Sequence, residues 1–299
     1  MAAQPPCILT RLTGGLGNQL FQYATGLALA ERTGLPLLLD ITGFETYKLH
    51  RYSLGAFDLR APFADEKTIR HYRQEDGVLR RRLRSFGTLT GLRLGTYFSE
   101  RGLGLNAALL RRRGPTYLDG YWQHEAYFSG HRGLLGERLA VTEAPSPTTA
   151  DLLTRIQSLP GAVSLHVRRG DYVSDPATLA AHGLCDLAYY RRAAQAVKAR
   201  VPHPHFFLFS DDPEWVRRSL DLDAPCTHVD HNDASRNYDD FRLMAACPHH
   251  IIANSSFSWW GAWIRQVPGQ CIIAPARWFA DEGREKQVRG IIPPGWTRL

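Results

Sequence analysis

The sequence predicts an α/β protein of two Rossmann-like domains that face a cleft, and three observations lead to this fold class. The chain has 299 residues, of which 44% are hydrophobic, enough for two ordinary cores. Residues 8–40 follow a pattern of strand, glycine loop, helix and strand, which is typical of a parallel sheet. Strand and helix patterns alternate again after a proline-containing stretch at 143–149, which predicts a linker. We therefore expect domains at residues 1–148 and 149–299.

The first domain opens on an apolar strand at residues 8–12, followed by a glycine loop at 13–18. The helix expected at 19–32 carries apolar residues at helical spacing, and Gly34 is suited to end it. A second strand follows at 35–40. The less regular remainder of the domain predicts helices at 64–84 and 105–112 and a strand at 116–118.

The second domain alternates short apolar runs with amphipathic ones, as expected of strands joined by helices. Strands are expected at residues 162–167, 206–210, 227–229, 249–253 and 271–274. Helices are expected at residues 186–200, 213–220, 236–247 and 257–266. Open α/β sheets bind ligands at the carboxyl ends of their strands, so residues that directly follow strands are the first candidates for a site.

Composition narrows the class of protein and of ligand. The net charge is +7, and 32 of the 36 basic residues are arginine, which suits an anionic ligand such as a nucleotide. Binding of nucleic acid is the general alternative for a basic chain, but no nucleic-acid motif accompanies the charge. Exposed helix faces explain the arginine runs at 80–84 and 111–113 more simply, while a peripheral contact with a membrane stays open.

The cysteines and the N-terminus bear on the compartment. Five widely spaced cysteines include no Cys-x-x-Cys pair, so neither a zinc site nor a disulfide framework is indicated. The first residues lack the pattern of a secretory signal, and no run of 18 apolar residues exists. We therefore expect a soluble, cytoplasmic protein.

The stretch at residues 166–172 carries the strongest sign of chemistry. It places His166, Arg168 and Asp171 directly after an apolar strand, at the edge where ligands bind. Arginine presents a fork of N–H donors that matches phosphate oxygens. We therefore predict a phosphorylated ligand with an acid or base beside it. Taken alone, this stretch is also consistent with a charged surface turn.

A glycine-rich loop at residues 14–19 is a second candidate. Glycines such as Gly15 and Gly17 let the backbone approach a phosphate, and the following helix N-terminus offers N–H groups. The spacing matches neither the dinucleotide-binding fingerprint nor a P-loop. A tight turn that binds no ligand is an equal interpretation.

Two strand ends of the second domain add further candidates. Asp211 and Asp212 precede Pro213, so one of them caps a helix, and we favour Asp212 for that structural role. Near residue 254, amide and hydroxyl groups precede an aromatic helix, an arrangement suited to an anion. Phe257 can stack there on a base or a sugar.

In the first domain, residues 118–125 combine aromatic and polar side chains. Rings such as Tyr121 and Trp122 stack on the apolar side of sugars, and Gln123 can bind sugar hydroxyls. Packing of these residues within the protein is the alternative interpretation.

Together these stretches resemble the bacterial and animal α-1,2-fucosyltransferase family, which shares motifs with α-1,6- and protein O-fucosyltransferases. The resemblance implies a glycosyltransferase B-type fold, with GDP-fucose as donor held mainly by the second domain. It implies a galactose-containing glycan as acceptor held mainly by the first domain, α-1,2 transfer to the galactose 2-hydroxyl with inversion at the anomeric carbon, and no obligatory metal or other cofactor. The alternatives are another sugar-nucleotide transferase on the same fold and a nucleotide- or glycan-binding protein without catalysis. The matching stretches are GGLGNQLFQYA (14–24), GYWQ (120–123), HVRRGDY (166–172), FSDDPEWV (209–216) and ANSSFSWWGAW (253–263).

The same resemblance assigns roles to single residues. Arg168 is expected to bind the β-phosphate, with His166 beside the diphosphate or ribose and Asn18 touching the donor from the first domain. The further donor-binding candidates are Gly15, Gly17, Asp211, Asn254, Ser255, Ser256 and Phe257. The acceptor-binding candidates are Tyr121, Trp122 and Gln123.

The catalytic base does not carry over. The α-1,6 enzymes have a Glu ten residues after the motif's His, where this chain has Pro176. Asp171 and Asp175 are the nearest carboxylates, and we favour Asp171 because it lies within the turn. Proton transfer to the departing diphosphate is a third route. The guanine-reading Asp of the relatives has no clear counterpart, because its place falls near His249 and His250.

Overall fold

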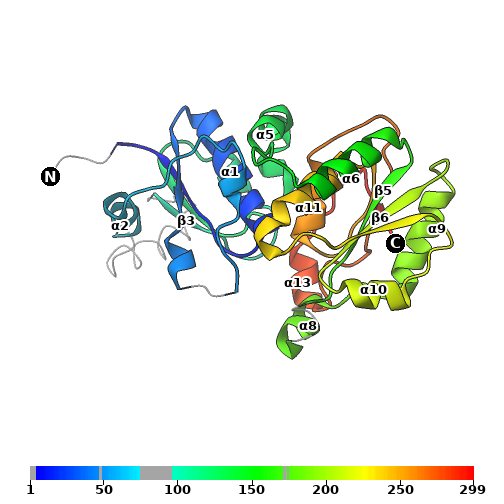
Figure 1. Ribbon diagram of the computed structural model, residues 1–299. Helices are drawn as coiled ribbons and strands as arrows, with labels where there is room; N and C mark the ends of the chain where they lie inside the picture. Colours follow the sequence, from blue (N-terminus) through cyan, green and yellow to red (C-terminus); the bar gives the residue numbers. More distant parts are fainter. Residues whose placement is uncertain (1–4, 47–48, 75–95, 171–172, 174) are drawn as a thin grey trace. The chain divides into compact units, whose positions relative to one another are not determined.

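The computed structural model describes residues 5–46, 49–74, 96–170, 173 and 175–299 and divides into two compact units (Figure 1). Unit 1 comprises residues 1–54 and 59–132, and unit 2 comprises 55–58 and 133–299. Residues 133–148, which we assigned to the first domain, thus group with the second. Hydrogen bonds help to hold them there, because Arg236 and Arg242 donate to the carbonyls of Ala144 and Glu143.

Unit 1 is built on a four-stranded parallel sheet in the order β2-β1-β4-β3. Its strands are β1 (Ile8–Arg11), β2 (Leu37–Asp40), β3 (Tyr97–Ser99) and β4 (Thr116–Asp119). Its helices, among the described residues, are α1 (Leu16–Thr33), α2 (Glu66–Gln74) and α4 (Ala107–Leu110). Its 3-10 turns are η1 (Thr42–Glu45), η3 (Glu125–Tyr127) and η4 (Ser129–His131), and η2 (Leu54–Ala56) leads from it into unit 2.

Helices cover both faces of the unit 1 sheet. Successive side chains of a strand point to opposite faces. Helix α1 packs on the face of Thr10, because a Cβ added at Gly26 would lie 2.1 Å from the Thr10 hydroxyl. Helix α2 packs on the other face, where Tyr72 joins the buried cluster around Leu9 and Tyr117.

Unit 2 holds a six-stranded, all-parallel sheet in the order β10-β9-β8-β5-β6-β7. Its strands are β5 (Ala162–Val167), β6 (His205–Ser210), β7 (Cys226–Val229), β8 (His249–Ile251), β9 (Ile272–Ala274) and β10 (Thr297–Arg298). This order is the one typical of dinucleotide-binding domains, in which the direction of strand addition reverses between β5 and β8.

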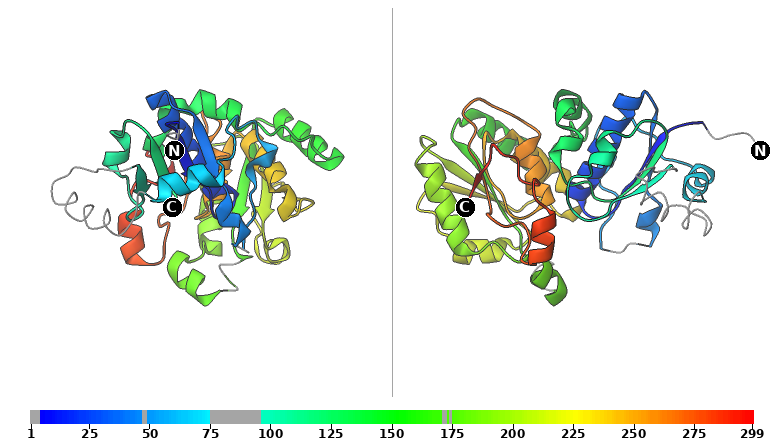
Figure 2. Two further views of the ribbon diagram at one scale, coloured as in Figure 1. Left: turned by 90° about the vertical axis from the view of Figure 1, so that its left-hand side faces the viewer. Right: turned by 180° about the vertical axis from the view of Figure 1, so that it is seen from behind.

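The helices of unit 2 lie on both faces of this sheet (Figure 1). Among the described residues they are α5 (Arg132–Arg138), α6 (Pro147–Ser158), α8 (Pro176–His182), α9 (Leu187–Lys198), α10 (Pro213–Ser219), α11 (Asn237–Ala246), α12 (Ser256–Trp263) and α13 (Glu282–Gln287), with the 3-10 turn η5 (Ala234–Arg236). Helices α9 and α10 pack against Leu165, Leu208 and Ile251, whereas α6 and α11 pack against Phe207 and Phe209. Outside the sheet, α8 lies beside the start of α13 (Figure 2), where backbone N–H groups donate to carbonyls at the end of α8.

The expected α/β class with parallel sheets is confirmed, with differences at the ends of elements. Helix α1 begins at Leu16, so Gly17 and Asn18 lie in its first turn rather than in a loop. Helix α6 begins inside the expected linker, because the Ser146 hydroxyl accepts the N–H of Thr149 and caps it. Strands β3 and β10 and helices α5, α8 and α13 were not expected, and α4 is shorter than expected. Beyond Gln74, the helix expected at 64–84 lies outside the described residues, as does the arginine run at 80–84.

Candidate active site

The carboxyl edge of the unit 2 sheet brings together two segments that the sequence singled out. Strands β5 and β8 are neighbours, and the segments that follow them begin at Arg168 and Ile252. The strand order reverses between these two strands, which is where open α/β sheets bind ligands. The rings of His166 and Phe257 meet there, with centroids 5.8 Å apart. The two segments therefore meet at one place on this edge.

Arg168 is oriented by a carboxylate from the next strand. It follows β5, and Asp211 follows the neighbouring strand β6, so that Arg168 Nη1 lies 2.9 Å from Asp211 Oδ2. Both side chains remain about one quarter exposed, at 27% and 25%. A guanidinium presents a planar fork of N–H donors that matches the oxygens of a carboxylate or a phosphate. The arrangement suits recognition of an anion at this edge.

Arg169 has different contacts from its neighbour. Its Nε donates to Asp212 Oδ2 at 3.1 Å, and its guanidinium lies 4.0 Å from the centroid of the Trp215 ring. Its backbone N–H donates to Asp211 Oδ1 at 2.8 Å. A Cβ added at Gly170 would lie 2.6 Å from Asp211 Oδ2, so a larger residue there would displace the Asp211 carboxylate. Arg169 thus joins the turn to α10.

The two aspartates that follow β6 make different contacts. Asp212 Oδ1 accepts the N–H of Trp215 and caps α10, with Pro213 in its first turn, as we expected. Asp211 contacts the turn after β5 instead. The ion pairs that orient Arg168 and Arg169 therefore include carboxylates from another strand end, which sequence spacing alone did not indicate.

His166 is buried on β5 and is held in its neutral form. Burial lowers the pKa of its imidazole to about 4, an effect that Asp211 opposes and the Arg168 cation reinforces. Within the described part of the chain, its Nδ1 has no hydrogen-bond partner. A neutral imidazole with an unengaged ring nitrogen can donate or accept one hydrogen bond to a ligand, but it carries no charge with which to neutralise a phosphate.

The segment before α12 is anchored by Asn254. Its Nδ2 donates to the carbonyl oxygens of His182 and Trp278, at 3.0 and 3.2 Å. Ser255 occupies the N-cap position of α12, yet its side chain makes no capping hydrogen bond. Ser256 opens the helix. Asn254 therefore contributes to the shape of the segment, while donor binding by the two serines stays a prediction.

The two carboxylates considered as base differ in what the structure describes. Asp171 lies outside the described residues. Asp175 is exposed and caps α8, accepting the N–H groups of Ala177 and Thr178 and the Thr178 hydroxyl. Hydrogen bonds, chiefly from Thr178, lower the pKa of Asp175. A carboxylate with a lowered pKa is a weaker base, so this position suits a helix cap better than proton abstraction.

In unit 1 the glycine loop is held by a buried glutamine that we did not single out. Gln19 Nε2 donates to the carbonyls of Gly14 and Arg51, and its Oε1 accepts the N–H of Ser53. Gly14 has φ +77°, a conformation that favours glycine. Gly15 is the N-cap of α1. The loop is thus fixed by its own contacts, and its role in phosphate binding stays a prediction.

The structure also joins the first turn of α1 to the expected acceptor segment. Gln123 Nε2 donates to Asn18 Oδ1 at 2.7 Å, across neighbouring strands β1 and β4. Tyr121 is exposed, whereas Trp122 is fully buried with its ring against Phe98 and Tyr127. Stacking on a sugar is therefore open to the ring of Tyr121, while the ring of Trp122 belongs to the core.

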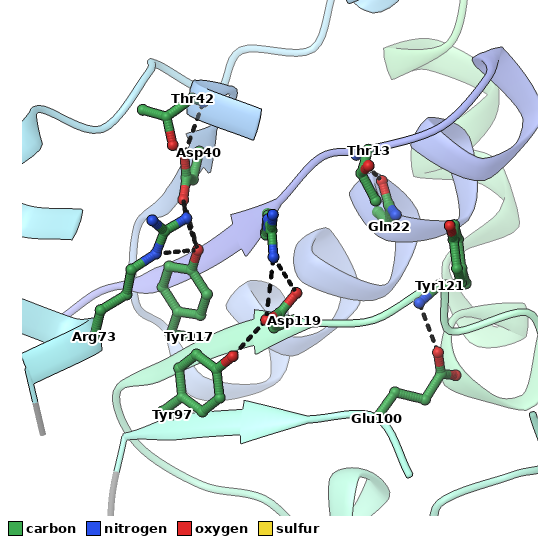
Figure 3. Close-up of polar contacts among 11 residues, drawn as sticks. Thr13, Gln22, Asp40, Thr42, Arg73, Tyr97, Glu100, Tyr117, Asp119 and Tyr121 are labelled. Atoms are coloured by element: carbon green, nitrogen blue, oxygen red, sulfur yellow. Dashed lines mark hydrogen bonds and ion pairs between the residues drawn. The ribbon is translucent and has the colours of Figure 1, made fainter. Parts of the chain in front are cut away.

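A polar cluster at the carboxyl edge of the unit 1 sheet also went unnoticed in the sequence. Arg73 and Tyr117 converge on the buried Asp40, at 2.7 and 2.5 Å (Figure 3). Burial opposes ionisation of Asp40, but hydrogen bonds from Thr42 and Tyr117 outweigh it and lower the pKa. Beside it, Asp119 is only partly buried and pairs with Arg11 at 3.2 Å. Asp40 is fully engaged within the protein, and Asp119 reaches the surface.

Asp240 is a further carboxyl group that we did not single out in the sequence. It lies in the first turn of α11, which joins β7 to β8 and so begins at the carboxyl edge of the sheet. Burial raises its pKa to about 7, although Asn232 donates to it at 2.8 Å. The sequence places the position that reads guanine near His249 and His250. The His250 ring is fully buried and bonded to the Ser164 hydroxyl, so it is not exposed to a ligand. The pair Asp239-Asp240 reads in sequence as an ordinary acidic helix start, which is why it gave no signal.

Among the helices of the described residues, none combines the length and the apolar composition that a membrane span needs. The same residues contain no group of three or more His, Cys, Asp or Glu placed to hold a metal ion.

Comparison with known proteins bears on the fold. The structure of the fucosyltransferase NodZ from Bradyrhizobium is similar to this one, with a TM-score of 0.50. A structure of NodZ co-crystallized with GDP gives the same TM-score. The match with the first of these covers 88% of this chain and 94% of that one at 18% identity. This likeness supports the glycosyltransferase B-type fold expected from the sequence.

Sequence relatives bear on the family. An α-1,2-colitosyltransferase of Escherichia coli is 33% identical over 98% of each chain. A galactoside α-(1,2)-fucosyltransferase 1 of Saimiri sciureus is 28% identical over 84% of this chain and 63% of its own length. The model of glycosyl transferase family 11 matches residues 7–299, nearly the whole chain. The protein therefore belongs to glycosyl transferase family 11 and is a glycosyltransferase.

Proposed function

We propose that this protein is an inverting galactoside α-1,2-fucosyltransferase, which moves L-fucose from GDP-β-L-fucose to the 2-hydroxyl of a galactose-terminated glycan. The observation that carries the proposal is the position of Arg168, held by Asp211 where the strand order of unit 2 reverses. Membership of family 11 supports the reaction type. The names of both sequence relatives share the α-1,2 linkage.

In this proposal unit 2 holds the nucleotide. Arg168 binds the β-phosphate, and neutral His166 donates or accepts a hydrogen bond beside the ribose or diphosphate. Phe257, in contact with His166, covers the nucleotide, and the hydroxyls of Ser255 and Ser256 lie at the start of α12. Asn18 and the glycine loop contribute donor contacts from unit 1.

The chemistry requires stabilisation of a departing diphosphate. Glycosyl transfer passes through an oxocarbenium-like state, in which positive charge grows on the sugar ring and negative charge on the leaving group. Preorganised donors often supply the largest part of catalysis, about 2.7–4 kcal/mol for one well-placed group. We assign that task to Arg168 and to backbone N–H groups at the strand ends, without an obligatory metal or other cofactor.

For the base we keep Asp171 ahead of Asp175. Asp171 follows Arg168 by three residues in the sequence. Asp175 is exposed and engaged as a helix cap. Asp175→Asn retains one oxygen for the cap and should transfer sugar at nearly the wild-type rate. Asp171→Asn should lower the rate by about 10²–10⁴-fold and remove a limb of the pH–rate profile. Unchanged profiles in both variants would favour proton transfer to the diphosphate.

A second candidate donor is GDP-colitose. The 33% identical relative is named as a colitosyltransferase, and colitose is L-fucose without one ring hydroxyl. A site built to bond a hydroxyl discriminates strongly against the sugar that lacks it, whereas an apolar site discriminates weakly. The ratio of kcat/KM for the two donors therefore separates the two functions.

The deciding experiment incubates the purified protein with GDP-fucose or GDP-colitose and N-acetyllactosamine, in the presence of a metal chelator. Product linkage is determined by NMR. We expect a fucose α-linked to the galactose O2, formed at an undiminished rate with chelator. Preferred use of GDP-colitose would establish the second candidate. Slow hydrolysis of GDP-fucose without transfer would mean that the donor is right and the acceptor is wrong. Binding of GDP without any turnover would support a non-catalytic binding protein instead.

A further inference from the structure

The segment Gly120–Gln123 owes its shape to one carboxylate. Glu100 follows β3, and its two oxygens accept the backbone N–H groups of Tyr121 and Trp122, at 2.6 and 3.0 Å. Figure 3 shows the first of these bonds. Hydrogen bonds to an ionised acceptor are roughly twice as strong as neutral ones. The bend of the segment is therefore set by a side chain from another part of unit 1.

The backbone conformation here needs such support. Trp122 has φ +57°, a left-handed conformation that bulky residues rarely adopt. Gly120 allows the close approach, because a Cβ there would lie 2.3 Å from the Cβ of Glu100. The buried ring of Trp122 packs against Phe98, which lies in the same strand end as Glu100. Contacts from both the carboxylate and the core thus fix one shape.

This shape presents two side chains outward from the core. Tyr121, between the two bonded N–H groups, is 39% exposed, which is high for a large ring. Gln123, one residue farther on, donates to Asn18 at the start of α1. A substrate that contacts Tyr121 would therefore meet a ring whose position depends on Glu100.

The surroundings of Glu100 disfavour its charged form, because the side chain is largely removed from water. Burial raises its pKa, and the two backbone hydrogen bonds oppose that effect without cancelling it. A neutral side chain would avoid the burial penalty but could not bond both N–H groups equally well. The burial of a carboxylate here is therefore explained by the two backbone hydrogen bonds that it accepts, which shape the segment.

We propose that Glu100 is the positioning residue of the acceptor subsite, which fixes the segment Gly120–Gln123 so that Tyr121 stacks on the galactose of the acceptor. The inference rests on the proposed function. Glu100 itself does not touch the substrate. It acts through the backbone of Tyr121 and Trp122.

The test is the Glu100→Gln variant, in which an amide NH₂ faces one of the two backbone N–H groups. With GDP-fucose as donor, we expect the KM for N-acetyllactosamine to rise about tenfold, the change that corresponds to about 1.4 kcal/mol. The rate of GDP-fucose hydrolysis, in which water replaces the acceptor, should stay at the wild-type value. Should this variant fail to fold, Glu100→Asp keeps the charge with a shorter reach and should show a smaller rise in the same KM.

Glu285→Gln is the matched control. Glu285 Oε2 likewise accepts two backbone N–H groups, those of Trp278 and Phe279, but it does so in unit 2. Both variants should lower Tm, and only Glu100→Gln should raise the acceptor KM. A lowered Tm with an unchanged acceptor KM would reduce Glu100 to a stabilising contact and overturn the proposal. A wild-type protein that neither binds nor fucosylates the galactoside would instead refute the proposed function, and the inference with it.

Discussion

Arg168 and Arg169 carry the same charge but contact different partners. Arg168 pairs with Asp211 at the open edge of the sheet, whereas Arg169 is bonded to Asp212 and stacked on Trp215. A bonded and stacked guanidinium stabilises the protein, while one at a ligand-binding edge stabilises charge on a ligand. Replacement of Arg168 should therefore lower activity, whereas replacement of Arg169 should lower stability.

We expect Arg168→Ala to lower kcat by at least ~100-fold, because it removes a donor aimed at the leaving diphosphate. Arg169→Ala should mainly lower the free energy of unfolding, by about 1–2 kcal/mol, since it loses a hydrogen bond and a cation–π contact. Urea unfolding and initial transfer rates measured on both variants separate the two effects. Near-wild-type turnover by folded Arg168→Ala would contradict the assignment.

His166 links the site to the pH dependence of stability. Burial lowers the pKa of its imidazole to about 4, whereas an unfolded chain protonates histidine near about pH 6.5. Its neutral form thus contributes stability that is present above about pH 6.5 and lost as pH falls toward that lowered pKa. The advantage of wild type over His166→Gln in unfolding free energy should be smaller at about pH 5 than at about pH 7. A pH-independent difference would show that the folded protein does not depress this pKa.

Single residues were predictable where a strand end or a cap marked them. His166 lies near the end of the apolar strand β5, Arg168 and Asp211 directly follow strands, and Asp212 precedes a proline at a helix start. Other residues act across large gaps in sequence and left no local mark. The contacts of Glu100 with Tyr121 and of Gln123 with Asn18, for example, depend on which strands are neighbours.

At the scale of elements, helix α1 shows how packing selects a residue against its helix propensity. Glycine in a helix interior is unfavourable by about 0.5–1 kcal/mol relative to alanine. Gly26 nevertheless lies in the middle of α1, where a Cβ would come within 2.1 Å of the Thr10 hydroxyl on β1. The close approach of helix and sheet is what requires glycine there.

Gly26→Ala should therefore destabilise the protein by about 1–3 kcal/mol through overpacking. Gly136→Ala is the control, because in α5 a Cβ at that position meets nothing within 4 Å. That variant should leave the free energy of unfolding unchanged or raise it by up to about 1 kcal/mol. Equal effects of the two substitutions in urea titrations would contradict the packing argument.

Elements were predictable where periodicity was long and misjudged where local signals are ambiguous. The helical spacing of apolar residues in α1 predicted the helix, and the apolar runs on either side of it predicted β1 and β2. Ser146 and Pro147 indicated a linker, yet a serine followed by a proline is also a helix start, and the structure uses it so. The three-residue strand β3 and the two-residue strand β10 are too short to show a period, and they form because neighbouring strands offer a partner.

At the scale of the whole molecule, topology explains why the motifs lie where they do. The parallel order of unit 2 places the ends of β5, β6 and β8 next to one another, so three motifs separated by dozens of residues meet at one edge. In unit 1 the neighbouring strands β1 and β4 do the same for the glycine loop and the segment Gly120–Gln123. Alternation of strands and helices predicted this class of fold, whereas strand order came only from the structure.

The most direct test of the central claim is a crystal structure of the protein with GDP, grown in the presence of a metal chelator. The account predicts the diphosphate at the carboxyl ends of β5 and β8, within hydrogen-bond distance of Arg168 and beside His166 and Phe257. A diphosphate bound elsewhere, or bound here without contact to Arg168, would contradict it.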